Sequence, residues 1–283
     1  MKRLLASSLL LLAGLSLPGV ARAADISING STTVLPIMQK VAEQYMAEHP
    51  DAKLALSGGG SGNGIKALID GLADVAMSSR EIKSGEVDQA KAKGVDPKQI
   101  AVAVDAIVPV VHPDNKVGEL SLDELRGIYM GSITNWKDVG GADARIVVVS
   151  RDTSSGTYET WETMVMKGER VAPSALLQAS NGAVVQAVSK NPNAIGYIGI
   201  GYLDKSTKGL QVNGKTATAA TALSREWPLS RELYIYTNGA PVGEVKGLVD
   251  YILDPQKGQK AGASVPAEGW TCWGCTAPQL GQA

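Results

Sequence analysis

The chain has 283 residues and nearly balanced charge, with 27 Lys and Arg against 28 Asp and Glu and a formal net charge of −1 at pH 7. Its length suits one large domain or two of ordinary size, and 44% hydrophobic residues are enough to build packed cores. The balance of charge gives no general case for nucleic-acid binding, two Cys exclude a disulfide-dense scaffold, and two His leave little for histidine catalysis or a metal cage.

The first 23 residues have the pattern of a secretory signal peptide. Lys2 and Arg3 precede an apolar stretch at residues 4–17, which is too short to span a membrane comfortably, and residues 21–23 form a small-x-small cleavage pattern. An uncleaved anchor is the alternative. We predict cleavage before Ala24 and a soluble, periplasmic or secreted protein.

Short apolar runs alternate with helical periodicity along the rest of the chain. Strands are expected at residues 26–28, 54–56, 74–77, 101–111, 146–149, 195–203 and 233–236, and helices near residues 34–49, 65–71, 158–165 and 184–191. This alternation predicts an α/β architecture with largely parallel sheets. No repeat or low-complexity linker is present, so a domain boundary would be a chain crossover.

Three expected strand-to-helix turns have the same composition. Residues 30–33, 60–64 and 154–157 place Gly, Ser and Thr at the first turn of a helix. Free N–H groups, the positive end of the helix dipole and the hydroxyls make such a turn suitable for an anion, although Ser and Thr are also ordinary helix caps. Three such turns at the carboxyl ends of strands favour an anion site at that edge.

Two arginines lie next to these turns. Arg151 comes just before the third turn, and Arg80 follows the strand at residues 74–77. A planar guanidinium suits a tetrahedral oxyanion, and the alternative for each is a solvated surface charge.

Enzyme templates fit the sequence poorly. Ile65 stands where a Walker A loop needs Lys, residues 58–64 do not contain G-x-G-x-x-G, and neither Ser61 nor Ser155 lies in G-x-S-x-G. The C-x-x-C spacing at residues 272–275 lies in the tail, where a local disulfide or a tail feature is favoured over redox catalysis. We expect no catalytic residues, no metal and no cofactor.

Several segments carry motifs that are specific in combination. They are NGSTTVLPI (29–37), SGGGSGNGIKAL (57–68), DVAMSSR (74–80), LRGIYMGSITNW (125–136), SRDTSSGT (150–157) and NAIGYIG (193–199). Together they resemble the PstS-type periplasmic phosphate-binding proteins, the substrate-binding components of phosphate ABC importers. The resemblance covers about residues 26–255.

This resemblance implies an α/β type II periplasmic binding protein fold, with two α/β lobes joined by two crossover strands. The crossovers are expected near residues 104–111 and 231–236. Lobe one would comprise residues 24–111 plus 231–283, and lobe two residues 112–230.

The resemblance also implies a set of phosphate-binding residues. These are Thr32, the backbone of Thr33, Ser61, Ser79, Arg80, Arg151, Ser155, Gly156 and Thr157.

One position departs from part of the family. Where Ser79 stands, some members carry an Asp that accepts a hydrogen bond from protonated phosphate, whereas a serine can either accept or donate. Asp152 and Asp105 are possible substitutes as acceptors. Asp152 is equally a candidate to pair with Arg151 or Arg80 and hold a guanidinium in place.

The function implied is reversible capture of inorganic phosphate between the lobes and its delivery to the membrane permease of an ABC transporter. The protein is expected to act as a monomer, without nucleic acid and not as an enzyme. The alternatives are a binder of another tetrahedral oxyanion, such as sulfate, molybdate or tungstate, and a secreted phosphatase. The phosphatase would need a nucleophile with a base or a metal cluster, and the sequence shows neither.

Overall fold

The computed structural model describes residues 25–263 and 271–272. The predicted signal peptide and cleavage site, and Cys275 of the predicted pair with Cys272, lie outside the described residues. The strands are β1 Asp25–Gly30, β2 Lys53–Gly58, β3 Val75–Ser78, β4 Pro97–Val111, β5 Glu119–Leu120, β6 Val147–Arg151, β7 Leu176–Gln178, β8 Ala194–Gly199, β9 Lys208–Gly209, β10 Gln211–Val212, β11 Ser230–Asn238 and β12 Thr271–Cys272. The helices are α1 Leu35–Glu48, α2 Ser61–Ile69, α3 Ser84–Ala92, α4 Leu122–Met130, α5 Gly156–Met164, α6 Asn181–Ser189, α7 Ala219–Leu223, α8 Gly243–Leu253 and α9 Gly258–Ala263.

The main sheet runs in the order β2-β1-β3-β11-β4-β8-β6-β7 and is mixed. Strand β1 is parallel to β2 and β3, and β6 is parallel to β7 and β8. Strand β11 is antiparallel to β3 and β4, and β8 is antiparallel to β4. The expectation of largely parallel sheets is therefore wrong at the centre, because β4 carries the chain across the molecule and β11 brings it back.

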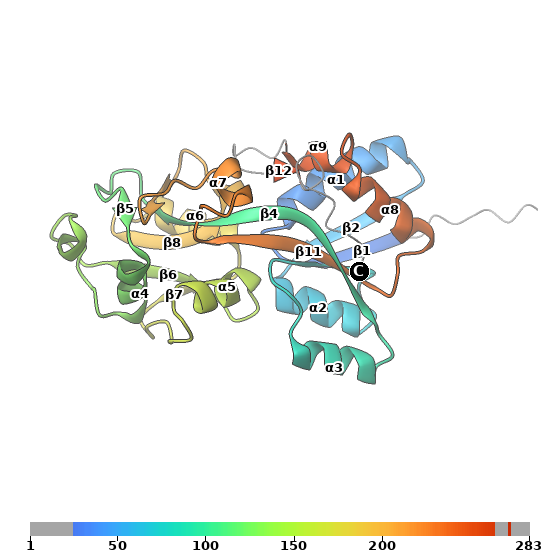
Figure 1. Cartoon of the computed structure of the whole chain (residues 1–283), viewed down its shortest axis with the longest axis horizontal. Coiled ribbons are helices and arrows are strands. Elements are labelled where there is room, and N and C mark those ends of the chain that lie inside the picture. Colours follow the sequence, from blue (N-terminus) through green and yellow to red (C-terminus); the bar gives the residue numbers. More distant parts are fainter. Residues whose placement is uncertain (1–24, 264–270, 273–283) are drawn as a thin grey trace, which may run out of the picture.

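The two long strands β4 and β11 connect the two ends of the molecule (Figure 1). They pair over the whole length of β11, with a register shift between Leu233 and Tyr234. At one end α1, α8 and α9 lie on one side of β1 and β2, and α2 and α3 lie on the other; at the other end β6, β7 and β8 lie among α4, α5, α6 and α7 (Figure 1). The crossover strands predicted from the resemblance correspond to β4 and β11.

The buried apolar residues form separate cores along these strands. One cluster draws only on residues 104–229, and the other two draw on residues 26–103 and 233–261. The change from one core to the other falls between Ala103 and Val104 on β4 and between Leu229 and Leu233 on β11. The lobe boundaries at residues 111/112 and 230/231 remain a prediction.

The three turns expected from the sequence each connect the end of a strand to the start of a helix. Strand β1 leads into α1, β2 into α2 and β6 into α5. In the second turn Gly60 adopts a φ of +99°, and the helix begins at Ser61, earlier than expected. A Cβ on Gly64 would lie 2.5 Å from the Cα of Gly30, so α2 packs directly on the end of β1 and holds the first two turns together.

The strand expected at residues 195–203 is too long. Strand β8 ends at Gly199, and the chain continues as a 3₁₀ turn at Ile200–Tyr202. The N–H of Ile200 donates to the carboxylate of Asp105 at 3.2 Å, so it does not continue the strand pairing. The turn places the hydroxyl of Tyr202 where it donates to the Thr32 carbonyl at 2.6 Å.

Gly64→Ala is expected to lower the free energy of unfolding by about 1–3 kcal/mol, because the new Cβ would overlap Gly30 and the Asn29 carbonyl. Chemical denaturation of the variant measures this change. Gly85→Ala in α3 is the matched control, since a Cβ there meets nothing within 4 Å. The control is expected to be neutral or stabilising by about 0.5–1 kcal/mol. Equal stability of the two variants would contradict the close approach of α2 to β1.

Candidate functional site

Four strand-to-helix turns meet between the two halves of the chain. The predicted turns before α1, α2 and α5 are joined by a fourth, Ser180–Asn181, which lies between β7 and α6. The Ser155 and Ser180 side chains cap α5 and α6 by accepting N–H groups from Tyr158 and Ala183. The polar residues buried here are Ser31, Thr32, Thr33, Ser61, Ser79, Asp105, Arg151, Ser155, Thr157, Asn181 and Arg231.

Hydroxyl and amide groups join the first turn to the third and fourth. The hydroxyls of Thr33 and Thr157 lie 3.0 Å apart. The side-chain amide of Asn181 donates to the hydroxyls of Thr32 and Thr33 at 3.1 and 3.0 Å. Its oxygen accepts the N–H of Gly199, which fixes the orientation of the amide. These contacts hold the cleft between the two halves in a closed arrangement.

The second turn approaches the third through Gly156. The Ser61 hydroxyl accepts the N–H of Ser79 at 3.0 Å and lies 3.2 Å from the Ser79 hydroxyl. A Cβ on Gly156 would lie 2.4 Å from the Ser61 oxygen and 2.8 Å from the Ser79 oxygen. Only a residue without a side chain fits at this position in the closed arrangement.

Arg151 is buried at the meeting point with no carboxylate partner. It is 1% exposed; its Nε donates to the Gln178 carbonyl and its Nη2 to the Ala179 carbonyl, both at 3.0 Å. Its Nη2 also lies 3.4 Å from the Thr32 hydroxyl. Within residues 25–263 and 271–272, no acidic group forms an ion pair with it, and its Nη1 has no hydrogen-bond partner. Burial lowers the pKa of Arg151, and a buried cation of this kind favours an anion beside it.

An aromatic pair fixes the strand that carries Arg151. The Tyr197 hydroxyl accepts the backbone N–H of Arg151 at 3.2 Å and lies 2.9 Å from the Ser150 hydroxyl. The Tyr197 ring stacks on Trp161 of α5, with ring centroids 4.2 Å apart and planes 7° apart. Burial raises the pKa of Tyr197, so this hydroxyl stays protonated. The core of this half therefore sets both Arg151 and the start of α5.

Arg80 is held by carboxylates instead of joining the hydroxyl cluster. Its two terminal nitrogens bind Glu86 at 2.7 and 2.8 Å, and its Nε lies 2.7 Å from Glu159 on α5 in an ion pair. Lys83 lies 2.8 Å from the same Glu159 carboxylate. The expectation that Arg80 contacts the anion is not supported by this geometry, because its positive charge is already balanced across the cleft.

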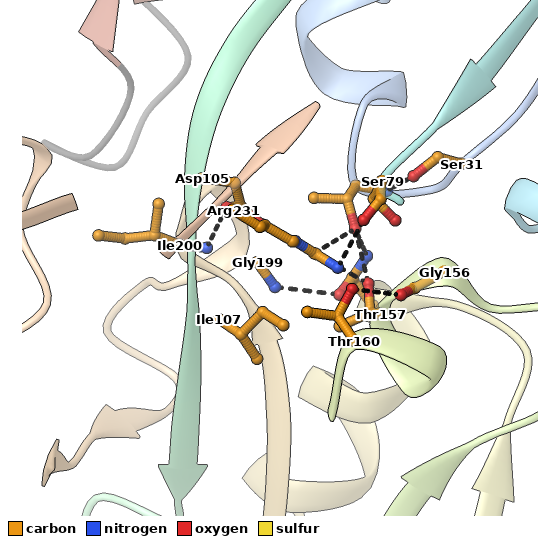
Figure 2. A network of polar contacts seen from close by, with 12 residues as sticks. Ser31, Ser79, Asp105, Ile107, Gly156, Thr157, Thr160, Gly199, Ile200 and Arg231 are labelled. Carbon is orange, nitrogen blue, oxygen red and sulfur yellow. Dashed lines mark hydrogen bonds and ion pairs between the residues drawn. The ribbon is translucent and has the colours of Figure 1, made fainter. Parts of the chain in front are cut away.

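Arg231, which the sequence analysis did not single out, lies within the cluster. It stands directly opposite Asp105 in the β4–β11 pairing, and its Nε and Nη2 donate to the Asp105 carboxylate at 2.9 and 2.8 Å. Figure 2 shows Arg231 extending from Asp105 toward Thr157 and Ser79. Complete burial raises the pKa of Asp105, and the guanidinium opposes part of that rise. The geometry makes Asp105 the partner that orients Arg231, and its expected role as a proton acceptor stays a prediction.

Asp152 organises the third turn. One carboxylate oxygen accepts the Ser154 N–H at 2.8 Å and the Ser154 hydroxyl at 2.5 Å. In the described part of the chain it forms no ion pair with Arg151 or Arg80, but its charge opposes the lowering of the Arg151 pKa by burial, and the pairing considered from the sequence stays a prediction. The turn it shapes contacts the second turn, because the Ser154 carbonyl accepts the N–H of Gly62 at 3.0 Å.

Three contributors to the site were missed by the sequence analysis, and their signals differ. Asn181 lies between Ser180 and Gly182, so this turn has the composition of the others, but the strand before it was not predicted and the turn was not recognised. Tyr202 was not singled out because it fell inside the strand expected at residues 195–203, which ends at Gly199 in the structure. Arg231 carries no local signal, because its place depends on its partner across β4.

A cleft of 360 Å³ opens beside the cluster. Its lining includes Ser79, Arg80, Glu159, Arg231 and Tyr234. The described residues contain no group of three or more His, Cys, Asp or Glu side chains that could hold a metal ion. They also include no helix with the length and hydrophobicity needed to span a bilayer.

Comparison with known proteins places the chain in a family. A model described as a PBP superfamily domain matches residues 18–256. The phosphate-binding protein PstS of Bacillus subtilis is 32% identical over 232 residues, which cover 81% of this chain and 75% of that protein. The chain belongs to the PBP superfamily and to its PstS family. PstS of Staphylococcus aureus (strain USA300) is 34% identical over 235 residues, which cover 79% of this chain and 71% of that protein.

Solved structures agree with this assignment to the PstS family. A phosphate ABC transporter substrate-binding protein of Clostridium perfringens, with bound phosphate, shares 35% identity and a TM-score of 0.78, covering 84% of this chain and 96% of that one. An ABC-type phosphate transport receptor from Vibrio cholerae shares 34% identity and a TM-score of 0.69, covering 86% and 98%. The type II periplasmic binding protein fold expected from the sequence is confirmed.

Glu86→Gln is expected to lower the free energy of unfolding at pH 7 by about 1–3 kcal/mol, because it weakens a charged hydrogen-bond pair with the buried Arg80. Burial raises the pKa of Glu86, but the bonds from Arg80 and Lys83 more than offset this and leave it below the ordinary 4.5. A carboxyl group whose pKa is lowered by folding stabilises the fold at pH values above its pKa in the unfolded chain. This stabilisation is lost as the pH falls through its pKa in the folded protein.

The difference in stability between wild type and Glu86→Gln should therefore shrink below about pH 4.5, the ordinary pKa of this side chain. Thermal unfolding between pH 3 and pH 7 measures it. Glu43→Gln is the control, since its pair with Lys40 is exposed. A difference that stays constant with pH would contradict the role given to the Glu86 carboxylate.

Proposed function

We propose that this protein captures inorganic phosphate in the closed cleft between its two halves and delivers it to the membrane permease of an ABC transporter. The observation that carries the proposal is Arg151, a guanidinium that is 1% exposed and has no acidic partner within the described residues. Breaking a buried ion pair by removing one partner costs several kcal/mol, so a bound oxyanion is a strong complement to this charge.

The groups around Arg151 suit a tetrahedral oxyanion. Gly156 and Thr157 are the first residues of α5, and their N–H groups lie at the positive end of that helix. The Thr32 hydroxyl lies 3.4 Å from Arg151 Nη2, the Ser61 oxygen lies beside Gly156, and Ser155 caps the start of α5. We infer that the ligand-binding set comprises Thr32, Thr33, Ser61, Ser79, Arg151, Ser155, Gly156 and Thr157, without Arg80.

The choice of phosphate is supported by the relatives. Those compared with the chain are named phosphate-binding proteins, and the similar structure from Clostridium perfringens holds phosphate. Their names describe binding or transport components and not enzymes, and we infer the same for this chain. In this proposal the protein works outside the cytoplasm as a monomer after removal of residues 1–23, with no nucleic acid and no cofactor.

Arg151→Met is expected to weaken phosphate binding at least about tenfold, equivalent to 1.4 kcal/mol, because it removes the buried charge that the anion neutralises. Isothermal titration of purified protein measures this. Arg126→Met is the control, since Arg126 pairs with an exposed Asp123 away from the cleft. Unchanged phosphate affinity in Arg151→Met would refute the site. Displacement of phosphate by equimolar sulfate from wild type would instead favour a general oxyanion binder.

Gly156→Ala tests whether the closed arrangement is the binding state. Its Cβ would overlap Ser61 and Ser79, so the two halves should fail to close and phosphate affinity should fall at least about tenfold. Gly182→Ala is a matched control in the first turn of α6, where the nearest atoms to a Cβ are 3.9 Å away. Wild-type affinity in Gly156→Ala would show that phosphate binds without this closure.

A further inference from the structure

Arg231 lies on the crossover strand β11 and forms hydrogen bonds to residues on both sides of the cleft. Besides Asp105, it donates through Nη1 to the Ser79 carbonyl at 3.2 Å. Its Nη2 has two protons for three acceptors: one bonds Asp105, and the other is shared between the hydroxyls of Thr33 at 3.3 Å and Thr157 at 3.0 Å. It therefore contacts the turn before α1, the end of β3 and the start of α5 from one buried position (Figure 2).

These donors determine where the Thr33 hydroxyl proton can go. A hydroxyl oxygen has two lone pairs and one proton. The Thr33 oxygen accepts from the Asn181 amide and takes a share of the Arg231 proton, so both of its lone pairs face donors. Its proton must then be donated, and the Thr157 oxygen lies 3.0 Å away.

The same reasoning applies to Thr157. Its oxygen accepts from Arg231 and from Thr33, so its own proton is directed away from both. Thr157 belongs to the first turn of α5, beside the Gly156 N–H, where the bound anion is placed by the proposed function. Thr157 is thereby set as a donor to that anion.

We propose that Arg231 is a positioning residue of the phosphate site. Asp105 on the neighbouring strand anchors Arg231, and the bonds of Arg231 to Thr33 and Thr157 make the Thr157 hydroxyl a donor to the ligand. The inference rests on the proposed function. Arg231 does not need to touch the anion, because its Nε and Nη2 are already engaged by Asp105 and by the two hydroxyls.

Asp105 is essential to this arrangement. It is completely buried, and its second oxygen accepts the Ile200 N–H at 3.2 Å, so the carboxylate is fixed on both sides. Removing either charge alone would leave the other buried and unpaired. A test of Arg231 must therefore keep a positive charge next to Asp105.

Arg231→Lys meets that requirement. Its ammonium can pair with Asp105 but is a compact group on a flexible stem, without the planar fork that reaches Asp105, Thr33 and Thr157 together. We expect phosphate affinity to fall at least about tenfold by isothermal titration. Thermal unfolding without phosphate should change little. Arg225→Lys is the matched control, since Arg225 lies on the surface and pairs with Glu232.

A double-mutant cycle with Thr157→Val separates this role from a merely structural one. If Arg231 acts through the Thr157 hydroxyl, Arg231→Lys should weaken phosphate binding less than about threefold in the Thr157→Val background, compared with at least about tenfold in the wild type. Thr157→Ser keeps the hydroxyl and should restore the full effect of Arg231→Lys.

The outcomes are distinguishable. If wild type does not bind phosphate, the proposed function fails. If wild type binds and Arg231→Lys binds equally well, or if the effects of the two substitutions simply add, the inference about Arg231 is overturned while the proposed function stands. Loss of folding in Arg231→Lys would be seen by thermal unfolding. The Asp105→Asn, Arg231→Gln double variant, in which neither member of this pair is charged, then replaces it in the same cycle with the same expected outcome.

Discussion

The site depends on a buried positive charge that forms no ion pair with an acidic side chain in the described part of the chain. Arg151 is buried beneath the turns that begin α1, α2, α5 and α6, and its near neighbours are carbonyls, hydroxyls and helix N-termini. Neutral acceptors reduce the cost of desolvating the guanidinium without cancelling its charge. In the proposed function, an anion held between the two halves completes this electrostatic arrangement, so binding and closure would be two aspects of one interaction.

The two other arginines beside the cleft, Arg80 and Arg231, differ from Arg151 because each is paired with a carboxylate. Arg80 is neutralised by Glu86 and by Glu159, the second of which lies across the cleft on α5. Arg231 is neutralised by Asp105 on the adjacent strand. Of these three arginines, Arg151 is the one that forms no ion pair with an acidic side chain in the described part of the chain. Opposite charges thus hold the framework, and the charge without a partner is available to the ligand.

Much of the site followed from local patterns. The turns before α1, α2 and α5 were predicted because Gly, Ser and Thr recur at three junctions of an apolar strand and a helix, which favours an anion site over ordinary helix caps. Arg151 was predicted to bind the anion because it comes just before such a turn. The turn before α6 has the same composition and was overlooked because the short, mostly exposed strand β7 before it was not predicted. The mixed sheet was missed because strand direction depends on the crossovers and not on any single strand.

The sequence by itself determined the α/β alternation, the predicted turns and the absence of an enzyme template, because each depends on residues close together in the chain. Only the tertiary structure decided which charges meet. Asp105 and Arg231 are 126 residues apart and become partners through the register of β4 and β11. Arg80 leaves the hydroxyl cluster because folding brings Glu159 to it. Ion pairs and hydroxyl orientations depend on distances of a few ångströms between remote segments, which no local pattern encodes.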